Sequence, residues 1–274
     1  MIEIGHLDKT FTQPGGEKAH ALHDVSLSIP AGQFLTVIGS NGSGKSTILN
    51  AIAGVFLPDS GTIRISDADV TRLPEHQRAR FIGRVFQDPF KGTCPGMSVA
   101  ENLRMAELRG MPRRLWRGLD RTSLGRYRAL LASLKMRLEG RLEASMGTLS
   151  GGQRQAVTLL MATLRRPDLL LLDEHTAALD PRAAEQVMIL TDEVVRTHKL
   201  TTLMVTHSME QAIQFGDRTV MMHRGEIIAD LSGAEREGSS EASLLQRFAE
   251  LKYTAEVRYT MAFAVSNVDT PKEK

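Results

Sequence analysis

Residues 39–47 read GSNGSGKST, directly behind the apolar run FLTVI at 34–38 and ahead of the helix-like STILNAIAG. The three glycines around one lysine leave little side chain to pack and are costly to order. Glycines let successive backbone N–H groups converge on phosphate oxygens, and a following helix adds the positive end of its dipole. The stretch matches G-x-x-x-x-G-K-[ST] without a mismatch. It therefore predicts a strand, a phosphate-binding loop and a helix, in that order.

The members of this loop have separate predicted roles. Lys45 would place its charge on the β- and γ-phosphates, and the hydroxyl of Ser46 can ligate Mg²⁺. We expect the whole loop to contact a nucleotide, that is Gly39, Ser40, Asn41, Gly42, Ser43, Gly44, Lys45, Ser46 and Thr47. A glycine-rich turn that matches by chance is the alternative, and the strand and helix on either side argue against it.

A second feature is DLLLLDE at residues 168–174. Four leucines predict a strand at the sheet centre, with Asp173 and Glu174 at its carboxyl end, the edge where open α/β sheets bind ligands. Asp173 can hold Mg²⁺ through water, and Glu174 can accept a proton from an attacking water. Alone, the pattern is that of a strand ending in solvated acids. Behind a phosphate loop it predicts a metal ligand and a catalytic base.

The rest of the chain divides by its patterning. Near-continuous apolar strands alternate with amphipathic helices, which indicates an α/β fold with a parallel sheet covered on both faces. Residues 1–38 look strand-rich, and 59–66 read as a hairpin-like strand pair. An arginine-rich stretch with helical patterning predicts an inserted helical subdomain at about 88–150. We expect one domain over 1–230 and a short C-terminal extension over 231–274 with a disordered end.

Composition narrows the possible functions. The net charge of +2 is too small to indicate nucleic-acid binding by itself. The single cysteine, Cys94, excludes an internal disulfide framework and fits a reducing compartment. Uninterrupted apolar runs are short, such as LLLL at 169–172, whereas a membrane span takes about 20 apolar residues. We therefore expect a chain that does not cross a bilayer and whose membrane role, if any, is peripheral.

A third feature, Leu149-Ser150-Gly151-Gly152-Gln153, stands at the start of a predicted helix before Asp173. It resembles the LSGGQ signature of ATP-binding cassette (ABC) ATPases, and the resemblance covers about residues 1–230. Four further matches follow the family's order: Phe11 fits the aromatic that stacks on adenine, Gln87 the Q-loop, Asp180 in Ala178-Leu179-Asp180 the D-loop, and His207 the switch histidine. Their order and spacing in one chain carry the resemblance.

The resemblance implies a P-loop NTPase fold of the ABC type: a mostly parallel core sheet, an antiparallel β subdomain and an inserted α-helical subdomain. It also implies ATP and Mg²⁺ as cofactors. The implied catalytic residues are Glu174, His207, Lys45 and Asp180; the implied nucleotide contacts beyond the loop are Phe11, Gln87, Ser150, Gly151, Gly152 and Gln153; the implied metal ligands are Ser46, Gln87 and Asp173. Two positions depart from the family pattern, because His175 replaces a frequent Pro and Ala177 a frequent Ser.

In the family, two cassettes pair head to tail, with ATP between the phosphate loop of one and the signature of the other. This chain carries one cassette, so the resemblance implies pairing with a second copy of itself. The bare N–H groups at the tip of the signature helix would then face the partner's γ-phosphate.

The resemblance further implies a cytoplasmic subunit, peripheral on the inner face of the cell membrane, that energises a separate permease working with an extracytoplasmic solute-binding protein. The motif wording looks like cassettes paired with branched-chain-amino-acid-type permeases, which suggests an amino acid or related small solute and no nucleic acid. Two alternatives stay open: a soluble ABC ATPase acting on nucleic acid or the ribosome, and the ATPase of a lipid-extracting or mechanical membrane complex.

Two segments keep open interpretations. The arginine-rich stretch 112–128 could face lipid head groups or a permease, or be a solvated helix face. The alternating segment 253–265 could add a strand or form a dimer contact.

Overall fold

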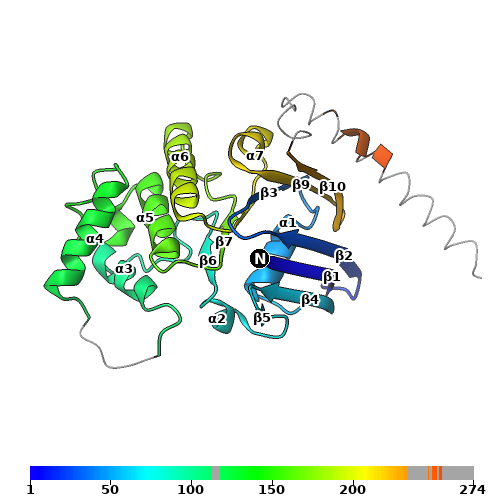
Figure 1. The fold of residues 1–274 in the computed structure, drawn as a ribbon, viewed down its shortest axis with the longest axis horizontal. Helices are drawn as coiled ribbons and strands as arrows, with labels where there is room; N and C mark the ends of the chain where they lie inside the picture. Colours follow the sequence, from blue (N-terminus) through cyan, green and yellow to red (C-terminus); the bar gives the residue numbers. More distant parts are fainter. Residues whose placement is uncertain (113–117, 234–245, 247–248, 252, 255–274) are drawn as a thin grey trace, which may run out of the picture.

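The structure, a computed structural model, describes residues 1–112, 118–233, 246, 249–251 and 253–254 (Figure 1). Residues 113–117 of the arginine-rich stretch lie outside this described part, as do residues 255–265 of the alternating segment and the PKEK end. The interpretations that depend on those residues stay predictions.

A six-stranded sheet forms the centre of the molecule, and its strands are the apolar runs that the sequence marks out. Its order is β10 (Glu226–Ser232), β9 (Arg218–His223), β3 (Phe34–Gly39), β8 (Thr202–Val205), β7 (Leu169–Asp173) and β6 (Ile82–Val85). All neighbouring pairs are parallel except β9 and β10, which form an antiparallel hairpin. The mostly parallel core sheet is therefore confirmed.

The leucines of β7 show why this strand lies inside the sheet. All four are fully buried, and they alternate between the two faces. Leu170 and Leu172 belong to the core that contains residues of α5 (Gly151–Thr163) and α6 (Pro181–His198). Leu169 and Leu171 belong to the opposite core, which contains residues of α1 (Lys45–Ala53). Burial on both faces explains the unbroken apolar run.

A second, antiparallel sheet packs against α1 in that opposite core. Its order is β2 (Lys18–Ile29), β1 (Ile2–Thr12), β4 (Ser60–Ile65) and β5 (Ala68–Asp69). The hairpin-like pair predicted within residues 59–66 is wrong, because β4 is one strand along its length, pairing with β1 from Ile2↔Ile65 to Asp8↔Ser60. The chain reverses only after β4, at Ser66, whose φ of 53° is left-handed. Gly61 lies inside the strand.

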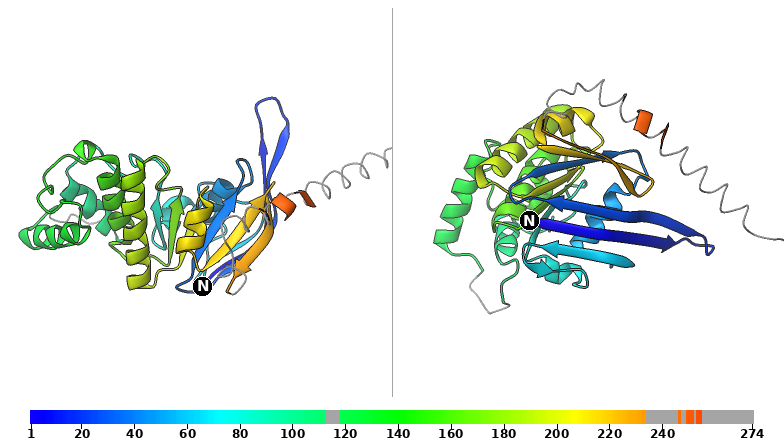
Figure 2. Two further views of the ribbon diagram at one scale, coloured as in Figure 1. Left: turned by 90° about the horizontal axis from the view of Figure 1, so that it is seen from above. Right: turned by 45° about the vertical axis from the view of Figure 1, so that its right-hand side comes forward.

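Helices lie along the described part of the stretch predicted as a helical insertion. They are α3 (Val99–Glu107), α4 (Arg121–Ser133) and the short 3₁₀ helix η1 (Met146–Thr148). Figures 1 and 2 show α3 and α4 beside α5, at the end of the molecule away from the antiparallel sheet. Two shorter helices, α2 (Glu75–Arg78) and α7 (Met209–Phe215), connect strands elsewhere. Among the residues described, none of the helices has the length and apolar character needed to cross a membrane.

Several arginines of this helical part bind within the chain. Arg126 of α4 pairs with Glu107 of α3, and Arg104 pairs with the same carboxylate at 2.9 Å. Arg109 donates to the carbonyl oxygens of Ala162 and Arg165, at 2.9 and 2.6 Å. Part of the arginine content therefore stabilises the packing of the insertion.

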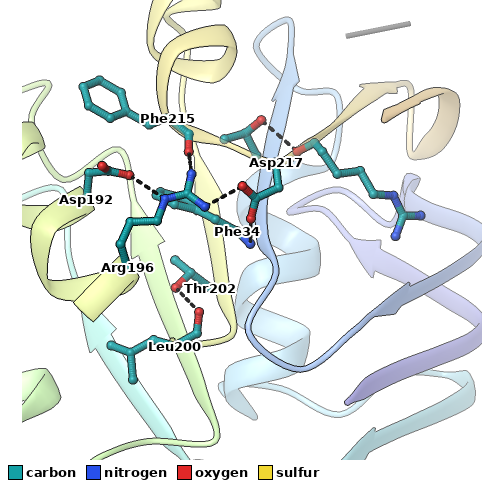
Figure 3. Close-up of polar contacts among 9 residues, drawn as sticks. Phe34, Asp192, Arg196, Leu200, Thr202, Phe215 and Asp217 are labelled. Carbon is teal, nitrogen blue, oxygen red and sulfur yellow. Dashed lines mark hydrogen bonds and ion pairs between the residues drawn. The ribbon is translucent and has the colours of Figure 1, made fainter. Parts of the chain in front are cut away.

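The end of the sheet opposite the glycine loop is held by one ion-pair cluster (Figure 3). Asp217 accepts a hydrogen bond from the backbone N–H of Phe34, at the start of β3, at 2.8 Å. Arg196 of α6 pairs with the other oxygen of Asp217 at 2.5 Å and donates to the Phe215 carbonyl at 2.7 Å. The start of β3, and with it the strand that leads into the loop, is thereby tied to α6 and to the end of α7.

Candidate functional site

The loop after β3 has a backbone that only glycine can supply at key points. Gly39, Gly42 and Gly44 have φ values of 156°, 76° and 102°, in the left-handed range that favours glycine. A Cβ atom on Gly39 would lie 2.3 Å from the Met222 carbonyl oxygen, and one on Gly44 would lie 2.8 Å from that of Ala21. The glycines therefore bring the loop backbone close to β2 and β9.

Lys45 lies inside the curve of this loop. Its residue is only 4% exposed, and its Nζ donates to the carbonyl oxygens of Gly39 and Ser40, at 2.8 and 3.0 Å. Burial lowers the pKa of Lys45, and the nearby charge of Glu174 partly offsets that effect. The two carbonyls carry no net charge, so they stabilise the buried ammonium only in part. A phosphate group beside Nζ would supply an anionic partner.

The N-terminus of α1 offers a second feature that suits an anion. Its N-cap is Gly44, so no side chain accepts from the first backbone N–H groups of the helix. Within the described residues, the buried Ser43 Oγ also has no hydrogen-bond partner. Together with the glycine cradle, these donors fit a phosphate chain.

A cleft of about 490 Å³ opens over this loop. It is lined by Ala19, His20, Ala21, Asn41, Gly42, Ser43, Gly44, Lys45, Ser46, Thr47, Glu174 and His207. The sequence predicts nearly all of these, apart from the residues of β2. No sequence motif indicates His20, because its place in the cleft comes from the pairing of β2 with β1.

Glu174 follows β7 with a left-handed φ of 45°, and its carboxylate joins three predicted residues. His207 Nε2 lies 2.5 Å from Oε1, and Gln87 Nε2 donates to Oε2 at 3.3 Å. The Lys45 ammonium is close enough to interact electrostatically with this carboxylate. Residues from four separate segments therefore meet at the carboxyl ends of the strands, where the sequence placed them.

Asp173 has a partner that the sequence did not predict. Arg84 on β6 places Nη2 3.1 Å from Asp173 Oδ2 and donates to Asn50 Oδ1 of α1 at 2.7 Å. The side chain of Arg84 is 12% exposed. An arginine inside the short apolar strand FIGRVF was the signal that could have found it, because a buried charge needs a partner.

The three predicted metal ligands offer only hard oxygen donors: a hydroxyl, an amide and a carboxylate, the ligand types that Mg²⁺ prefers. Ser46 lines the nucleotide cleft, whereas Gln87 and Asp173 line a second hollow with Asn50 and Arg84. In the described part of the chain, no three His, Cys, Asp or Glu side chains group as a metal site. The set fits a metal that takes its remaining ligands from phosphate and water.

The signature residues form the first turn of α5. Ser150 is the N-cap, its Oγ accepts from the Gln153 N–H, and Gln153 Oε1 accepts from the Ser150 N–H, both at 3.3 Å. The expectation of a bare helix tip is therefore wrong in part, since this capping box already uses two backbone donors. The N–H groups of Gly151 and Gly152 have no intrahelical acceptor and are the donors that the turn has left.

The signature lines a hollow of its own, of about 350 Å³, apart from the Lys45 cleft. Ser150, Gly152 and Gln153 contribute to it, and so does Asp180. Asp180 caps α6 by accepting from the Ala183 N–H at 3.1 Å. The structure thus brings Asp180 to the signature and not to Glu174 within one chain.

Phe11 lies near the cleft without lining it. Its ring meets Phe56 edge-on, with centroids 5.1 Å apart, and Phe11 is 38% exposed. In the β1–β2 pairing it is opposite Ala19, which does line the cleft.

The two departures from the family pattern also find places. His175 is fully buried behind Glu174, and its Nε2 lies 3.0 Å from Thr191 Oγ1 of α6. Thr191 donates to the Val187 carbonyl at 2.7 Å, so it accepts from the N–H of the neutral imidazole. Burial lowers the pKa of His175 to about 4. Ala177 donates its backbone N–H to the Glu174 carbonyl at 2.9 Å.

Comparisons with known proteins indicate one family. A family model described as "ABC transporter" matches residues 22–177. The chain is 43% identical over 248 residues to the tyrosine transport ATP-binding protein of Clostridioides difficile (strain R20291), covering 90% of this chain and 98% of that protein. It is 32% identical over 252 residues to a methionine import ATP-binding protein of Sodalis glossinidius (strain morsitans), covering 90% of this chain and 70% of that protein.

Solved structures give the same result. A dimeric structure of the ATP-binding cassette MJ0796, in a post-hydrolysis state bound to ADP and Pi, matches with a TM-score of 0.71 and 30% identity, over 85% of this chain and 98% of that one. MJ1267, an ATP-binding cassette of an ABC transporter in its ADP conformation, matches with a TM-score of 0.73 and 25% identity, over 92% and 97%. The family model spans more than half of the chain, and the chain therefore belongs to the ABC transporter family.

Proposed function

We propose that this chain is the ATP-hydrolysing subunit that energises uptake of a small solute through a separate membrane permease. The observation that carries the proposal is the convergence on Glu174. Its carboxylate is held by Gln87 and His207 at the edge of a cleft that also contains Lys45 and a phosphate-type loop. ABC ATPases couple the hydrolysis of ATP to transport, and relatives with 30% identity or more carry import or transport names.

The residues divide the work of phosphoryl transfer as follows. The backbone donors of residues 39–47 and the Lys45 ammonium bind and orient the β- and γ-phosphates. Glu174 accepts the proton of the water that attacks the γ-phosphorus, and ADP leaves with the electrons of the broken P–O bond. His207 holds Glu174 and faces the γ-phosphate, while Phe11 stacks on the adenine.

Mg²⁺, held by Ser46 and by Asp173 and Gln87 directly or through water, would neutralise charge on the phosphates. To bind the metal, Asp173 either loosens its pair with Arg84 or uses its other oxygen, Oδ1, because only Oδ2 contacts the arginine.

We propose a head-to-tail dimer, in which the signature of each copy completes the ATP site of the other. The support is that Ser150, Gly152 and Gln153 lie with Asp180 in a hollow separate from the Lys45 cleft. Donors with no anion of their own suit a γ-phosphate brought by a partner. One of the matched cassettes is described as dimeric.

The expected solute is an amino acid or a related small molecule. The relative with 43% identity is named for tyrosine transport, and others for methionine and phosphonates. Permease subunits, an extracytoplasmic solute-binding protein and a position on the inner face of the membrane complete the proposed system.

The test is ATP turnover in site variants. We expect Glu174→Gln to keep ATP binding, measured by calorimetry, while turnover falls by about 10²-fold or more. Glu185→Gln, at an exposed acid of α6, is the matched control and should leave turnover unchanged. Wild-type turnover in a clean preparation of Glu174→Gln would discard the assigned role.

The dimer has a test of its own. Copies that carry both Lys45→Ala and Ser150→Ala are mixed with wild-type copies. In a mixed dimer, the altered signature of the variant then faces the intact phosphate loop of the wild-type copy. Turnover per intact loop should fall below that of a mixture with Lys45→Ala alone. Equal turnover in the two mixtures would contradict the head-to-tail arrangement.

A further inference from the structure

Arg154, in the first turn of α5, is almost completely buried for a charged residue, at 2% exposed. Among the described residues no carboxylate lies within ion-pair distance of its guanidinium, although Asp88 is near enough for its charge to act on Arg154; the guanidinium instead donates to three carbonyl oxygens. These belong to Met146 at 3.2 Å, Gly147 at 2.9 Å and Leu149 at 3.1 Å. They form the signature turn, residues 146–149, which leads directly into Ser150.

The flat face of the same guanidinium lies over the ring of Phe90. The distance from Cζ to the ring centroid is 3.6 Å, which is close for a stacked arginine and aromatic ring. Phe90 lies three residues after Gln87, in a turn where its N–H donates to Asp88 Oδ1 at 2.9 Å. One side chain therefore touches both the segment that carries Gln87 and the turn that carries the signature.

The next residue of α5 makes a parallel contact. Gln155 is fully buried, and its Nε2 donates to the Phe86 carbonyl oxygen at 2.8 Å. Phe86 and Phe90 lie on either side of Gln87 in the sequence. The first turn of α5 therefore contacts the Gln87 segment, residues 86–90, both before and after Gln87. Gln87 itself donates to Glu174.

We propose that Arg154 is a positioning residue that locks the Gln87 segment and the signature turn into one body. A movement of Gln87 at the nucleotide site then moves the tip of α5 with it. Only an arginine suits this place, because its planar fork reaches several carbonyls while its face stacks on a ring. A second connection runs parallel, since the N–H groups of Met146 and Gly147 donate to the carbonyls of Met97 and Pro95. Removal of Arg154 should therefore loosen the turn without unfolding the insertion.

The proposal rests on the proposed function only for its effect on turnover, so the main test needs no nucleotide. Hydrogen exchange is measured by mass spectrometry on the full chain for peptides covering the Gln87 segment and the signature turn. In Arg154→Met, exchange in both peptides should rise by about tenfold or more over wild type. Arg154→Lys keeps a donor and a charge and should restore part of the protection. Arg141→Met is the matched control: among the described residues Arg141 donates to Thr148 of the same region at 3.5 Å and has no hydrogen bond with the Gln87 segment, so exchange in the Gln87 peptide should stay at the wild-type level.

A second variant separates coupling from local loss of structure. Phe90→Leu removes the ring but leaves all three carbonyl bonds of Arg154 possible, and Phe90 has no polar contact with the signature turn among the described residues. We expect exchange in the signature turn to rise by about threefold or more in Phe90→Leu. A signature turn whose exchange is unchanged in Phe90→Leu would overturn the proposal, because the loss of the turn's own bonds to Arg154 explains a rise in Arg154→Met without any coupling.

Turnover provides the functional readout. In Arg154→Met, kcat should fall by about tenfold, while the affinity of one copy for ATP stays within about twofold of wild type, because Arg154 does not line the cleft. Loss of ATP binding in the wild type as well would refute the proposed function and leave the exchange result to decide on Arg154.

Discussion

His175 gives the chain a stability that should depend on pH in a defined window. The imidazole is fully buried next to Glu174, and burial lowers its pKa from 6.5 to about 4. In the unfolded chain the same ring is exposed to water and titrates near 6.5. The perturbation we consider is a decrease in pH from 7.5 to 5, which protonates the ring in the unfolded state only.

The sign follows from the proton balance. Because the folded pKa is the lower one, the unfolded chain binds more protons between the two values, and the free energy of unfolding falls as pH falls. The contribution of His175 is fully present above pH 6.5 and is lost as pH falls toward 4. One pKa unit corresponds to about 1.4 kcal/mol, so the full shift is worth about 3 kcal/mol, of which about 2 kcal/mol is lost by pH 5.

The assay is urea unfolding of the wild type and of His175→Gln at several pH values between 7.5 and 5. Glutamine can donate to Thr191 as the imidazole does but cannot take up a proton. The difference between the two proteins isolates His175, because all other titrating groups are common to both. His76→Gln, at an exposed histidine of α2, is the matched control and should follow the wild type.

We expect the stability gap between the wild type and His175→Gln to move by about 2 kcal/mol across this range, in favour of the glutamine variant at low pH. Parallel curves for the two proteins would refute the reasoning, because they would mean that the buried ring is protonated in the folded state.

Three other predictions concern the cleft and the insertion. Lys45→Ala should weaken ATP binding by about tenfold or more, because the ammonium is the main charge facing the phosphates; unchanged affinity in calorimetry would count against this. Gly44→Ala should lose ATP binding and at least about 1 kcal/mol of stability, since its φ of 102° and the Ala21 carbonyl at 2.8 Å leave no room for a Cβ; wild-type melting and affinity would contradict it. Tyr127→Phe should cost about 1–2 kcal/mol in urea unfolding, because the buried phenol donates to Glu107; a loss below about 0.5 kcal/mol, the usual size of the effect of a surface substitution, would show that the two arginines satisfy the carboxylate alone.

Most of the fold could be predicted from the sequence because its strands and helices obey simple periodicities. The four leucines of β7 indicate burial on both faces, and Gly54, at the end of the helix-like run STILNAIAG, ends α1 with a φ of 81°. The prediction was wrong at residues 59–66, because this segment forms one strand, β4, and the chain reverses only after it, at Ser66. The pattern of this segment fits a hairpin and a single strand alike, and only the pairing with β1 distinguishes them.

The chemistry of the site was similarly predictable where motifs are contiguous. Glu174, Gln87 and His207 meet as expected, since parallel strands end at one edge. What the sequence could not give depends on contacts across elements. Arg84 on Asp173, and Arg154 on Phe90, are contacts whose partners lie on other elements; the apolar strand around Arg84 indicates that a partner is needed but not which one. The same holds for Asp180, which lies in the signature hollow.

The missing N-cap side chain of α1 has a consequence for the stability of the protein. Several helices are closed at their start by an N-cap side chain that accepts a backbone N–H group: Ser98, Asp120, Ser150, Asp180 and Ser208. The helix behind the glycine loop, α1, begins without such a closure. A nucleotide that supplies the closure becomes part of the folded architecture, and at a hundred times its Kd it would stabilise the chain by about 2.7 kcal/mol. The nucleotide is thus also a structural component, and without it the cassette is less stable as well as inactive.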